Sequence, residues 1–278
     1  MATIATRHGV PAEKIRVLPS GVANYVYALG EHLVLRIPRS PQYVADLCKE
    51  AEVIQAARQI GVRTPAVVAF EPQTPYLVIE RVRGVEAGQL AVPNPRVFEE
   101  VGRELARLHT IAPALPHLPA DGIPPDPWAL IAELLAEGRI DEDAARWLSE
   151  WFDRLAPRIP IAPLRVLIHG DIAPQNLLVA DGALSGIIDW GDAMLADPAV
   201  DFAKLPLPLV PAALAGYRGL NMEPRVLWHH LLWAVARLRD PAMQPGPPGA
   251  RHWTAPPASR LLGILRFFTT TPYWRELM

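Results

Sequence analysis

Cysteine is almost absent from this chain. Cys48 is the only one among 278 residues, so no intramolecular disulfide can form. The first eight residues also lack the apolar run that forms the core of a secretory signal peptide. These two absences exclude the disulfide-stabilised secreted classes of protein, and we expect a cytoplasmic location.

An excess of charge of one sign is missing as well. The 27 basic and 29 acidic residues give a formal net charge of −2, which provides no strong field for nucleic acid or an anionic membrane. The most apolar long run, residues 205–217, contains three prolines and is too short to span a bilayer. We therefore expect no nucleic-acid partner, no membrane partner and a small molecule as ligand. The oligomeric state stays open.

Apolar residues, by contrast, are plentiful, at 50% of the chain, as in folded globular proteins. Segments 25–29 and 33–37 flank a tight Gly-containing connection, which predicts an antiparallel hairpin. Residues 44–60 have apolar residues at nearly helical spacing, followed by a glycine stop signal. Segments 67–70 and 76–80 return to strand character. The first eighty residues are thus predicted to form an antiparallel sheet with one helix.

Helical periodicity dominates the rest of the chain. Residues 95–110, 127–155 and 224–238 show it most clearly, and a pair of short strands is expected around Asp171 and Asp189. The proline- and glycine-rich stretch 241–257 is predicted to be irregular. The sequence therefore predicts an α+β protein whose second half is mainly helical.

One stretch carries a combination of residues that points to chemistry. His169-Gly170-Asp171 is followed by Asn176 and, after a second apolar run, by Asp189. Phosphoryl transfer to an alcohol needs one carboxylate to accept the hydroxyl proton, and a second carboxylate with an amide oxygen to hold Mg²⁺ on the phosphates. This segment supplies all three groups. Each residue could separately serve as a turn or capping residue, but the ordered combination favours phosphoryl transfer.

On these motifs the sequence resembles the aminoglycoside phosphotransferase family, protein-kinase-like enzymes that phosphorylate hydroxyls of antibiotics and other small molecules. The likeness covers roughly residues 17–205 and is carried by the runs at 169–176, 188–190 and 197–201. It implies a two-lobed protein-kinase-like fold. Residues 1–82 would form the N-terminal nucleotide-binding lobe, and residues 83–278 the C-terminal catalytic and acceptor-binding lobe.

The resemblance also implies roles for the motif residues. Asp171 would be the catalytic carboxylate, whereas Asn176 and Asp189 would bind the metal. His169 would pack and hydrogen-bond to hold the loop, and Asp201 would bond backbone amides of the same loop.

Nucleotide contacts are expected in the first lobe. The segment from Ser20 through Gly21 to Asn24 occupies the position of the kinase phosphate loop, and Gly21 permits a close backbone approach. Arg36 stands where a phosphate-binding lysine is usual in the family, and Glu50 on the predicted helix would pair with it.

The junction between the lobes would complete the nucleotide site. Backbone groups around Glu80 and Val82 would meet the adenine edge there. ATP is the expected nucleotide because it is usual in the family, and GTP is the alternative. Mg²⁺ is the expected metal.

The acceptor is the least constrained part of the interpretation. The acidic stretch 126–153 could receive the amines of an aminoglycoside, although an acidic solvated helix pair explains it more simply. The aromatic, arginine-rich stretch 205–278 would suit a macrolide-like ring, although most of its aromatics are expected in the core. We expect an ATP-dependent small-molecule O-phosphotransferase acting on an aminoglycoside-type or other antibiotic. A macrolide-like or metabolite-alcohol kinase and a non-catalytic pseudokinase that binds nucleotide are the alternatives.

Overall fold

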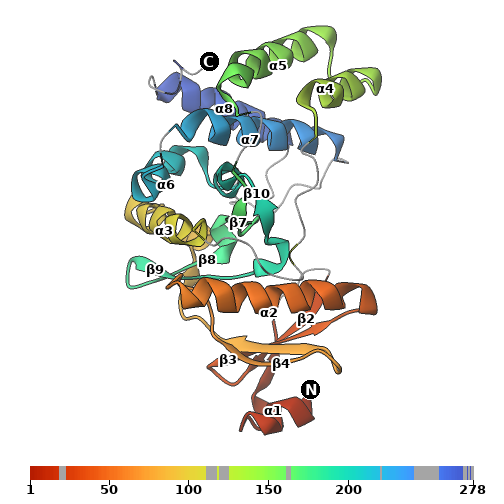
Figure 1. Ribbon diagram of the computed structural model, residues 1–278, viewed down its shortest axis with the longest axis vertical. Helices are drawn as coiled ribbons and strands as arrows, with labels where there is room; N and C mark the ends of the chain where they lie inside the picture. Colours follow the sequence, from red (N-terminus) through yellow and green to blue (C-terminus); the bar gives the residue numbers. More distant parts are fainter. Residues whose placement is uncertain are drawn as a thin grey trace.

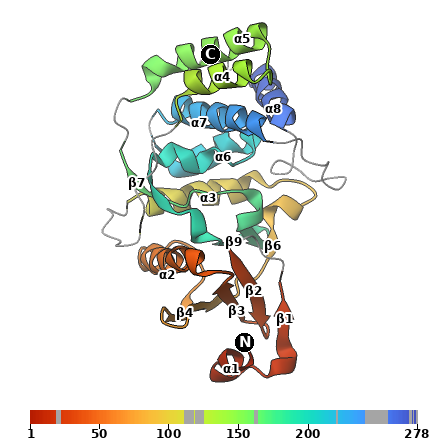
Figure 2. The ribbon, with the colours of Figure 1, turned by 90° about the vertical axis from the view of Figure 1, so that its right-hand side faces the viewer.

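The computed structural model describes residues 1–18, 23–110, 118, 125–160, 164–219, 221–240, 257–271, 274 and 276. They form two lobes stacked along the long axis of the molecule, a sheet-rich lobe below and a helical lobe above (Figure 1). In the perpendicular view the helices of the upper lobe lie in successive layers over the small strands that separate the lobes (Figure 2). The predicted two-lobed α+β fold is confirmed.

The lower lobe is built on a five-stranded antiparallel sheet. Its strands, in spatial order, are β1 (Ile15–Val17), β2 (Asn24–Leu29), β3 (Leu33–Pro38), β5 (Tyr76–Glu80) and β4 (Val67–Glu71). The predicted hairpin is β2 and β3, and Gly30 in its connection has φ 62°, a conformation that glycine adopts without steric cost. The predicted helix is α2 (Val44–Gln59), which lies between the sheet and the upper lobe (Figure 1).

A short helix that the sequence pattern did not predict covers the other face of this sheet. This is α1 (Ala2–Arg7), at the tip of the molecule (Figure 2). Ala5 from α1 packs with Leu29, Leu35 and Val78 from three strands. With only one buried residue in six, the helix has too little apolar periodicity to be recognised in sequence.

The upper lobe contains most of the helices. They are α3 (Pro95–Leu108), α4 (Pro127–Ala136), α5 (Glu142–Leu155), α6 (Val210–Tyr217), α7 (Glu223–Ala236) and α8 (Pro257–Thr270). The predicted segment 127–155 consists of two helices, because the chain turns at Gly138 with φ 67° and Asp141 caps the start of the second helix. Of residues 241–257, predicted to be irregular, 241–256 lie outside the described residues, and Pro257 is the first residue of α8.

Two of these helices approach so closely that their backbones touch. A β-carbon on Gly102 of α3 would lie 1.8 Å from the carbonyl oxygen of Ala213, and one on Gly216 of α6 would lie 1.9 Å from that of Glu99. Glycine at both positions is therefore what allows α3 and α6 to pack at this distance.

Two small sheets lie between the lobes and carry the loops of interest. β7 (Val166–Ile168) pairs with β10 (Met194–Ala196), and β8 (Leu177–Ala180) pairs with both β9 (Ala183–Ile187) and β6 (Val85–Glu86), all antiparallel. The expected strand pair around Asp171 and Asp189 is thus present. Short 3₁₀ helices join the elements: Ala12–Lys14, Pro41–Tyr43, Ala87–Gln89, Ala156–Arg158, Pro174–Asn176, Trp190–Asp192, Pro198–Phe202, Leu207–Leu209 and Arg237–Arg239.

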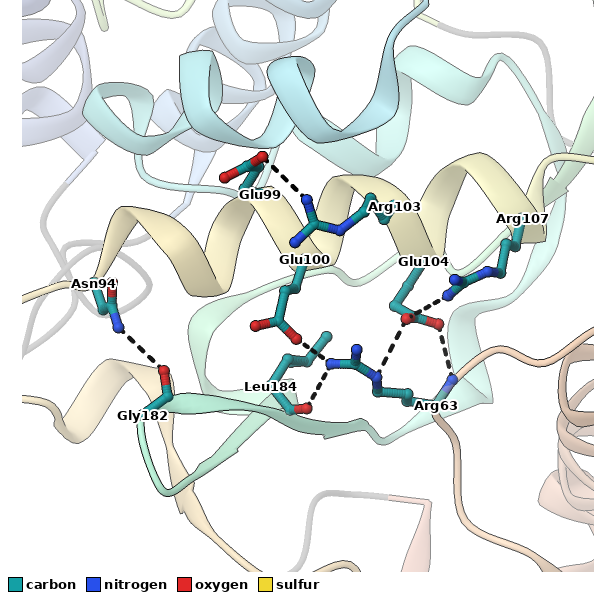
Figure 3. A network of polar contacts seen from close by, with 9 residues as sticks. All are labelled: Arg63, Asn94, Glu99, Glu100, Arg103, Glu104, Arg107, Gly182 and Leu184. Carbon is teal, nitrogen blue, oxygen red and sulfur yellow. Dashed lines mark hydrogen bonds and ion pairs between the residues drawn. The ribbon is translucent and has the colours of Figure 1, made fainter.

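The lobes share one buried core, which runs from α2 and the sheet through α3 to α8. A polar network supports this junction from the loop after α2 (Figure 3). Arg63 donates from its backbone to Glu104 of α3 over 3.0 Å and from its guanidinium to the carbonyl oxygen of Leu184 over 2.7 Å. Arg63 thereby ties the lower lobe to both α3 and β9. No helix among the described residues is long and apolar enough to cross a membrane.

Candidate active site

The loop after β7 presents Asp171, and its shape depends on a glycine. Gly170 has φ 79°, and a β-carbon there would lie 2.2 Å from the carbonyl oxygen of Asp192. Asp192 belongs to the turn after β9, so the two loops that carry the motif residues touch through their backbones. Only glycine satisfies both the conformation and the space.

Asp201 holds the backbone of this loop. Its carboxylate accepts hydrogen bonds from the amides of His169 (2.9 Å) and Gly170 (2.8 Å) and from Nε2 of His109 (3.1 Å). Burial alone would raise the pKa of Asp201, but the bonds from His109 and His169 outweigh it, and the pKa lies below its ordinary value. Burial raises the pKa of Tyr217 to about 12, so its hydroxyl keeps its proton beside Nδ1 of His109, 2.9 Å away.

His169 links the two loops and is held in one tautomer. Its Nδ1 accepts from the amide of Asp171 over 3.2 Å, so Nε2 carries the hydrogen that is donated to the carbonyl oxygen of Ile188 over 3.0 Å. Burial lowers the pKa of His169, which keeps the ring neutral. The ring also packs against Trp190, with 4.5 Å between the ring centres.

The carboxylate of Asp171 is held at both oxygens. Asn176 donates from Nδ2 to Oδ2 over 2.7 Å and to the main-chain oxygen of Asp171 over 2.9 Å. Lys204 donates from Nζ to Oδ1 over 2.8 Å. Because two acceptors fix the amide nitrogen of Asn176, its Oδ1 is turned away from Asp171 and is available as a ligand. Sequence reasoning found Asp171 and Asn176 but did not single out Lys204.

Arg36 and Glu50 form a buried ion pair that reaches the second loop. Nη1 of Arg36 lies 2.7 Å from Oε1 of Glu50 and 3.0 Å from Oδ1 of Asp189. Burial alone would lower the pKa of Arg36, but attraction to Glu50 and Asp189 outweighs it and raises the pKa. Burial raises the pKa of Glu50, a shift that Arg36 opposes. The predicted pairing of Arg36 with Glu50 is therefore present in the structure.

Asp189 is presented in an unusual backbone conformation. It has φ 67° and ψ 68°, in the left-handed region that residues other than glycine seldom adopt, and such strain is often found at functional sites. Its side chain is 52% exposed, and in the described part of the chain Arg36 contacts Oδ1 alone, which leaves Oδ2 available to a ligand.

These groups suit a magnesium ion. Within the described part of the chain no cluster of three or more His, Cys, Asp or Glu side chains has metal-site geometry. Mg²⁺ is commonly held by one or two carboxylates together with phosphates and water, so the combination of Asp189 and the Asn176 amide oxygen fits such an ion. The backbone amide of Ile188 donates to the carbonyl oxygen of Asn176 over 2.9 Å, which places the two ligand-bearing segments side by side.

A cavity of about 680 Å³ lies between the lobes. Seven of the predicted site residues line it: Asn24, Arg36, Glu50, Glu80, Val82, Asn176 and Asp189. Nε of Arg36 and Oδ1 of Asn24 are buried and have no hydrogen-bond partner among the described residues. Buried polar atoms of this kind are normally paired, so both are suited to a polar ligand. Ser20 and Gly21 lie outside the described residues.

Glu80 contributes to the cavity wall at the lobe junction but its side chain is also engaged elsewhere. Its Oε2 accepts from the amide of Ala66 over 3.2 Å and lies 3.7 Å from Nη1 of Arg58. Val82, which follows the end of β5, packs toward Gly186 of β9, where a β-carbon would meet the valine side chain at 2.8 Å.

Comparison with known proteins decides the family. The model of the phosphotransferase enzyme family matches residues 14–226. The chain belongs to this family. Viomycin phosphotransferase from Streptomyces vinaceus is 29% identical to this phosphotransferase over 205 residues, which covers 64% of this chain and 68% of that one. The resemblance seen in the sequence is confirmed.

Solved structures agree with the fold of this phosphotransferase. The GDP complex of aminoglycoside 2'-phosphotransferase-IIIa has a TM-score of 0.64 at 21% identity and covers 85% of this chain and 88% of that one. The macrolide 2'-phosphotransferase from Brachybacterium faecium has a TM-score of 0.62 at 18% identity, with coverage of 99% and 94%. At this level of identity the likeness establishes the kinase-like fold.

In the acidic stretch 126–153 of the phosphotransferase, several acidic side chains make structural contacts. Asp126 and Asp141 cap α4 and α5, and Asp153 accepts from the indole of Trp128 over 3.0 Å. Glu133 pairs with Arg239. The simpler interpretation of this stretch, a pair of helices with acidic capping and surface residues, agrees with these contacts.

Most described aromatics of the last quarter are packing residues. Trp228 lies against Phe152, with ring centres 4.9 Å apart, and Phe267, Phe268 and Trp274 are buried in the core. Trp253 and Tyr273 lie outside the described residues. The expectation that these aromatics mainly form the core holds for the ones that the structure describes.

Proposed function

We propose that this enzyme transfers the γ-phosphoryl group of a nucleoside triphosphate, with Mg²⁺, to a hydroxyl group of an antibiotic-type small molecule. The observation that carries the proposal is the position of Asn176. Its amide nitrogen bonds Asp171, and the same side chain lines the interlobe cavity together with Asp189 and Arg36. A base and a phosphate-binding site are thereby joined through one side chain.

Asp171 is the catalytic residue in this proposal. An alcohol has a pKa far above neutrality, so the enzyme gains most by orienting the hydroxyl and accepting its proton as the oxygen attacks phosphorus. The contacts from Asn176 and Lys204 hold the carboxylate in one orientation while each oxygen keeps a further lone pair for the hydroxyl.

Asn176 and Asp189 are the proposed metal ligands. These two side chains would hold a Mg²⁺ ion, which would neutralise charge on the phosphates. The part played by the chain is to hold both ligands at one edge of the cavity, through the hydrogen bond between Ile188 and Asn176 and the ion pair between Asp189 and Arg36.

The nucleotide is assigned to the interlobe cavity. Arg36, oriented by Glu50, would contact phosphate through its free Nε. Asn24 would accept a hydrogen bond from the nucleotide through its unpaired Oδ1. By their place in the sequence, Ser20 and Gly21 would belong to the phosphate loop, and the segment from Glu80 to Val82 would receive the base. The proposal allows either ATP or GTP, with ATP preferred. Among the similar solved structures, three are GDP complexes and two contain ATP or ADP.

The acceptor class follows the relatives. The names of the three relatives described above refer to viomycin, an aminoglycoside and a macrolide, all of which are antibiotics. We propose an acceptor of this class that binds to the helical lobe, residues 83–278, with the nucleotide bound mainly by residues 1–82. The domain boundary at 82/83 is supported by the five-stranded sheet, which ends at Glu80.

A mass-spectrometric screen tests the proposal. The enzyme would be incubated with Mg²⁺ and ATP or GTP and with viomycin, aminoglycosides, macrolides and metabolite alcohols, and a phosphate-sized mass gain would identify the acceptor. Asp171→Asn should lower the transfer rate by about 10²- to 10⁴-fold, the usual contribution of general-base assistance.

The same screen distinguishes the enzyme from a pseudokinase. Binding of Mg²⁺-nucleotide without transfer to any acceptor would favour a nucleotide-binding protein over a phosphotransferase. Transfer that survives Asp171→Asn would show that another group accepts the proton.

A further inference from the structure

Among the described residues, Lys204 makes the closest cationic contact to the proposed base. Its Nζ lies 2.8 Å from Oδ1 of Asp171 and 3.9 Å from Oδ2 of Asp192. The Lys204 and Asp171 side chains are only 20% and 16% exposed. An ion pair so far removed from solvent restricts both partners more than a surface pair does. Lys204 thus bridges the loop that carries Asp171 and the turn that follows Asp189.

The position of Lys204 is fixed by its neighbours. It follows the 3₁₀ helix Pro198–Phe202, which contains Asp201, and the flanking residues Phe202, Ala203 and Leu205 are buried. The segment 198–204 therefore holds the loop after β7 in two ways. Asp201 binds the backbone of this loop, and Lys204 binds the carboxylate of Asp171.

The lysine at position 204 is informative because nearly all basic residues of this chain are arginines. Only three of the 27 basic residues are lysines: Lys14, Lys49 and Lys204. A guanidinium fork commonly engages both oxygens of a carboxylate, whereas an ammonium acts as a point charge. At Asp171 a lysine takes Oδ1 and leaves Oδ2 to the amide of Asn176.

We propose that Lys204 is a positioning residue for Asp171. Its ammonium fixes Oδ1 while Asn176 fixes Oδ2, so the carboxylate presents one face to the acceptor hydroxyl. This inference rests on the proposed function, because the orientation of Asp171 matters only if Asp171 accepts the proton of the acceptor. Neither Lys204 nor Asp171 is among the residues that line the interlobe cavity proposed for the nucleotide, so Lys204 is expected to act through Asp171.

Substitution by methionine tests this role, since it keeps the unbranched side chain at one atom less in length and removes its charge. Lys204→Met should lower kcat by roughly 10- to 100-fold, because a small misplacement of a reacting group can cost about 100-fold. The KM for the nucleotide should stay within about threefold of wild type, because an interaction needed only in the transition state affects kcat. Lys14→Met, at an exposed lysine, is the matched control and should behave as wild type.

A double-mutant cycle separates positioning from an independent contact with substrate. In the Asp171→Asn background, Lys204→Met should change the residual single-turnover rate by less than about twofold, because residues that act as a unit are non-additive. A further loss as large as that in the wild-type background would overturn the proposal.

Chemical restoration of the amine distinguishes positioning from a general effect on folding. In a Cys48→Ser background, which should keep wild-type turnover, Lys204→Cys should lose activity and regain most of it when 2-bromoethylamine converts the new thiol into a lysine analogue. Failure to regain activity in a protein whose thermal unfolding matches the wild type would contradict the positioning role of Lys204.

The outcomes also separate this inference from the proposed function. If the wild-type enzyme transfers phosphate and Asp171→Asn abolishes transfer while Lys204→Met keeps kcat within twofold, only the inference about Lys204 fails. If the wild-type enzyme transfers no phosphate with Mg²⁺ and ATP or GTP, the proposed function fails and the role of Lys204 fails with it.

Discussion

At the residue scale, the candidate site depends on backbone conformations that most side chains disfavour. Gly170 and Asp189 both have positive φ, and they lie in the two loops that meet beside the cavity. An aspartate in the left-handed region is destabilised relative to an extended one unless its surroundings hold it. Here the pairing of Asp189 with Arg36 and the contact between Gly170 and Asp192 do so.

Substitution of Gly170 tests this dependence, and the chain offers a matched control. Gly170 and Gly182 have φ values of 79° and 77°, but a β-carbon would meet the backbone of Asp192 only at Gly170, with no atom within 4 Å at Gly182. Gly182→Ala should therefore cost about 1–2 kcal/mol, the cost of the left-handed conformation alone. Gly170→Ala should cost at least about 3 kcal/mol, since overpacking is added.

Urea unfolding of the two glycine variants measures the difference. Phosphate transfer should also fall in Gly170→Ala and stay near the wild-type rate in Gly182→Ala. Equal losses of stability in both variants would contradict the contact between the two loops.

The sequence predicted the polar residues of the site unevenly. Asp171, Asn176 and Asp189 were found because they occur within 19 residues along the chain, where spacing carries information. Lys204 and His109 were missed as partners, because their contacts with Asp171 and Asp201 span 33 and 92 residues and follow from tertiary packing. Asp201 was expected to bond loop amides only through the family resemblance, and its carboxylate does accept from two of them.

At the scale of elements, helix α3 is the support on which the lobe junction rests. Glu104 on its inner face is 1% exposed and binds the backbone and side chain of Arg63 as well as Arg107 (Figure 3). Glu99, on the same helix, pairs with Arg103 at a surface position where both side chains are 45% exposed. The two acids therefore differ in burial and not in the helix that carries them.

Alanine substitutions at these two acids test the junction. Glu104→Ala should lower the free energy of unfolding by about 2–3 kcal/mol, because it leaves the amide of Arg63 without its acceptor. Glu99→Ala should change it by less than about 0.5 kcal/mol, as for other exposed pairs. Chemical denaturation measures both, and a Glu104 variant as stable as the Glu99 variant would show that the network is dispensable.

The segment that contains Asp201 should make stability depend on pH. The pKa of Asp201 is lowered in the folded protein, so the folded state favours the carboxylate. That stabilisation is fully present above the ordinary value of 3.8 and is lost as the pH falls through the lower, folded pKa. Acid should therefore remove part of the stability that Asp201 supplies at neutral pH.

Comparison of the wild type with Asp201→Asn measures this contribution. At pH 7 the variant should be less stable by about 2 kcal/mol, the value of hydrogen bonds to a charged group. The difference should shrink as the pH is lowered below the ordinary value for an aspartate. A difference that stays constant from pH 7 into acid would contradict the lowered pKa.

The helices differed in how clearly the sequence predicted them. The helices α2, α3 and α7 carry apolar residues at helical spacing over at least 14 residues, and all three were predicted. The helix α1 was missed because it is short, and α8 because its periodicity follows a proline- and glycine-rich stretch. Periodicity therefore failed where an element is brief or adjoins a segment of irregular composition.

At the scale of the whole molecule, the continuous core and the interlobe cavity have opposite effects on how strongly the two lobes are held together. Apolar residues from α2, α3 and α7 form one cluster, which resists separation of the lobes. The cavity beside it is lined by acids and bases from both lobes, among them Arg36, Glu50, Asp46, Asp189 and Asp192. A ligand that bridges these groups should therefore add to the coupling of the lobes and stabilise the whole protein.

Thermal unfolding with nucleotide tests this coupling and the proposed metal site together. With Mg²⁺ and ATP or GTP at about 100 times Kd, binding to the folded state should add about 2.7 kcal/mol of stability and raise Tm. Removal of Mg²⁺ by a chelator should reduce the increase, because Asn176 and Asp189 would then face the phosphates without the ion between them. In Asp189→Asn the increase should depend little on Mg²⁺, whereas Asp181→Asn, at the β8–β9 turn outside the cavity lining, should respond as the wild type does. An equal rise in Tm with and without Mg²⁺ in the wild type would rule out a metal held between Asn176, Asp189 and the nucleotide.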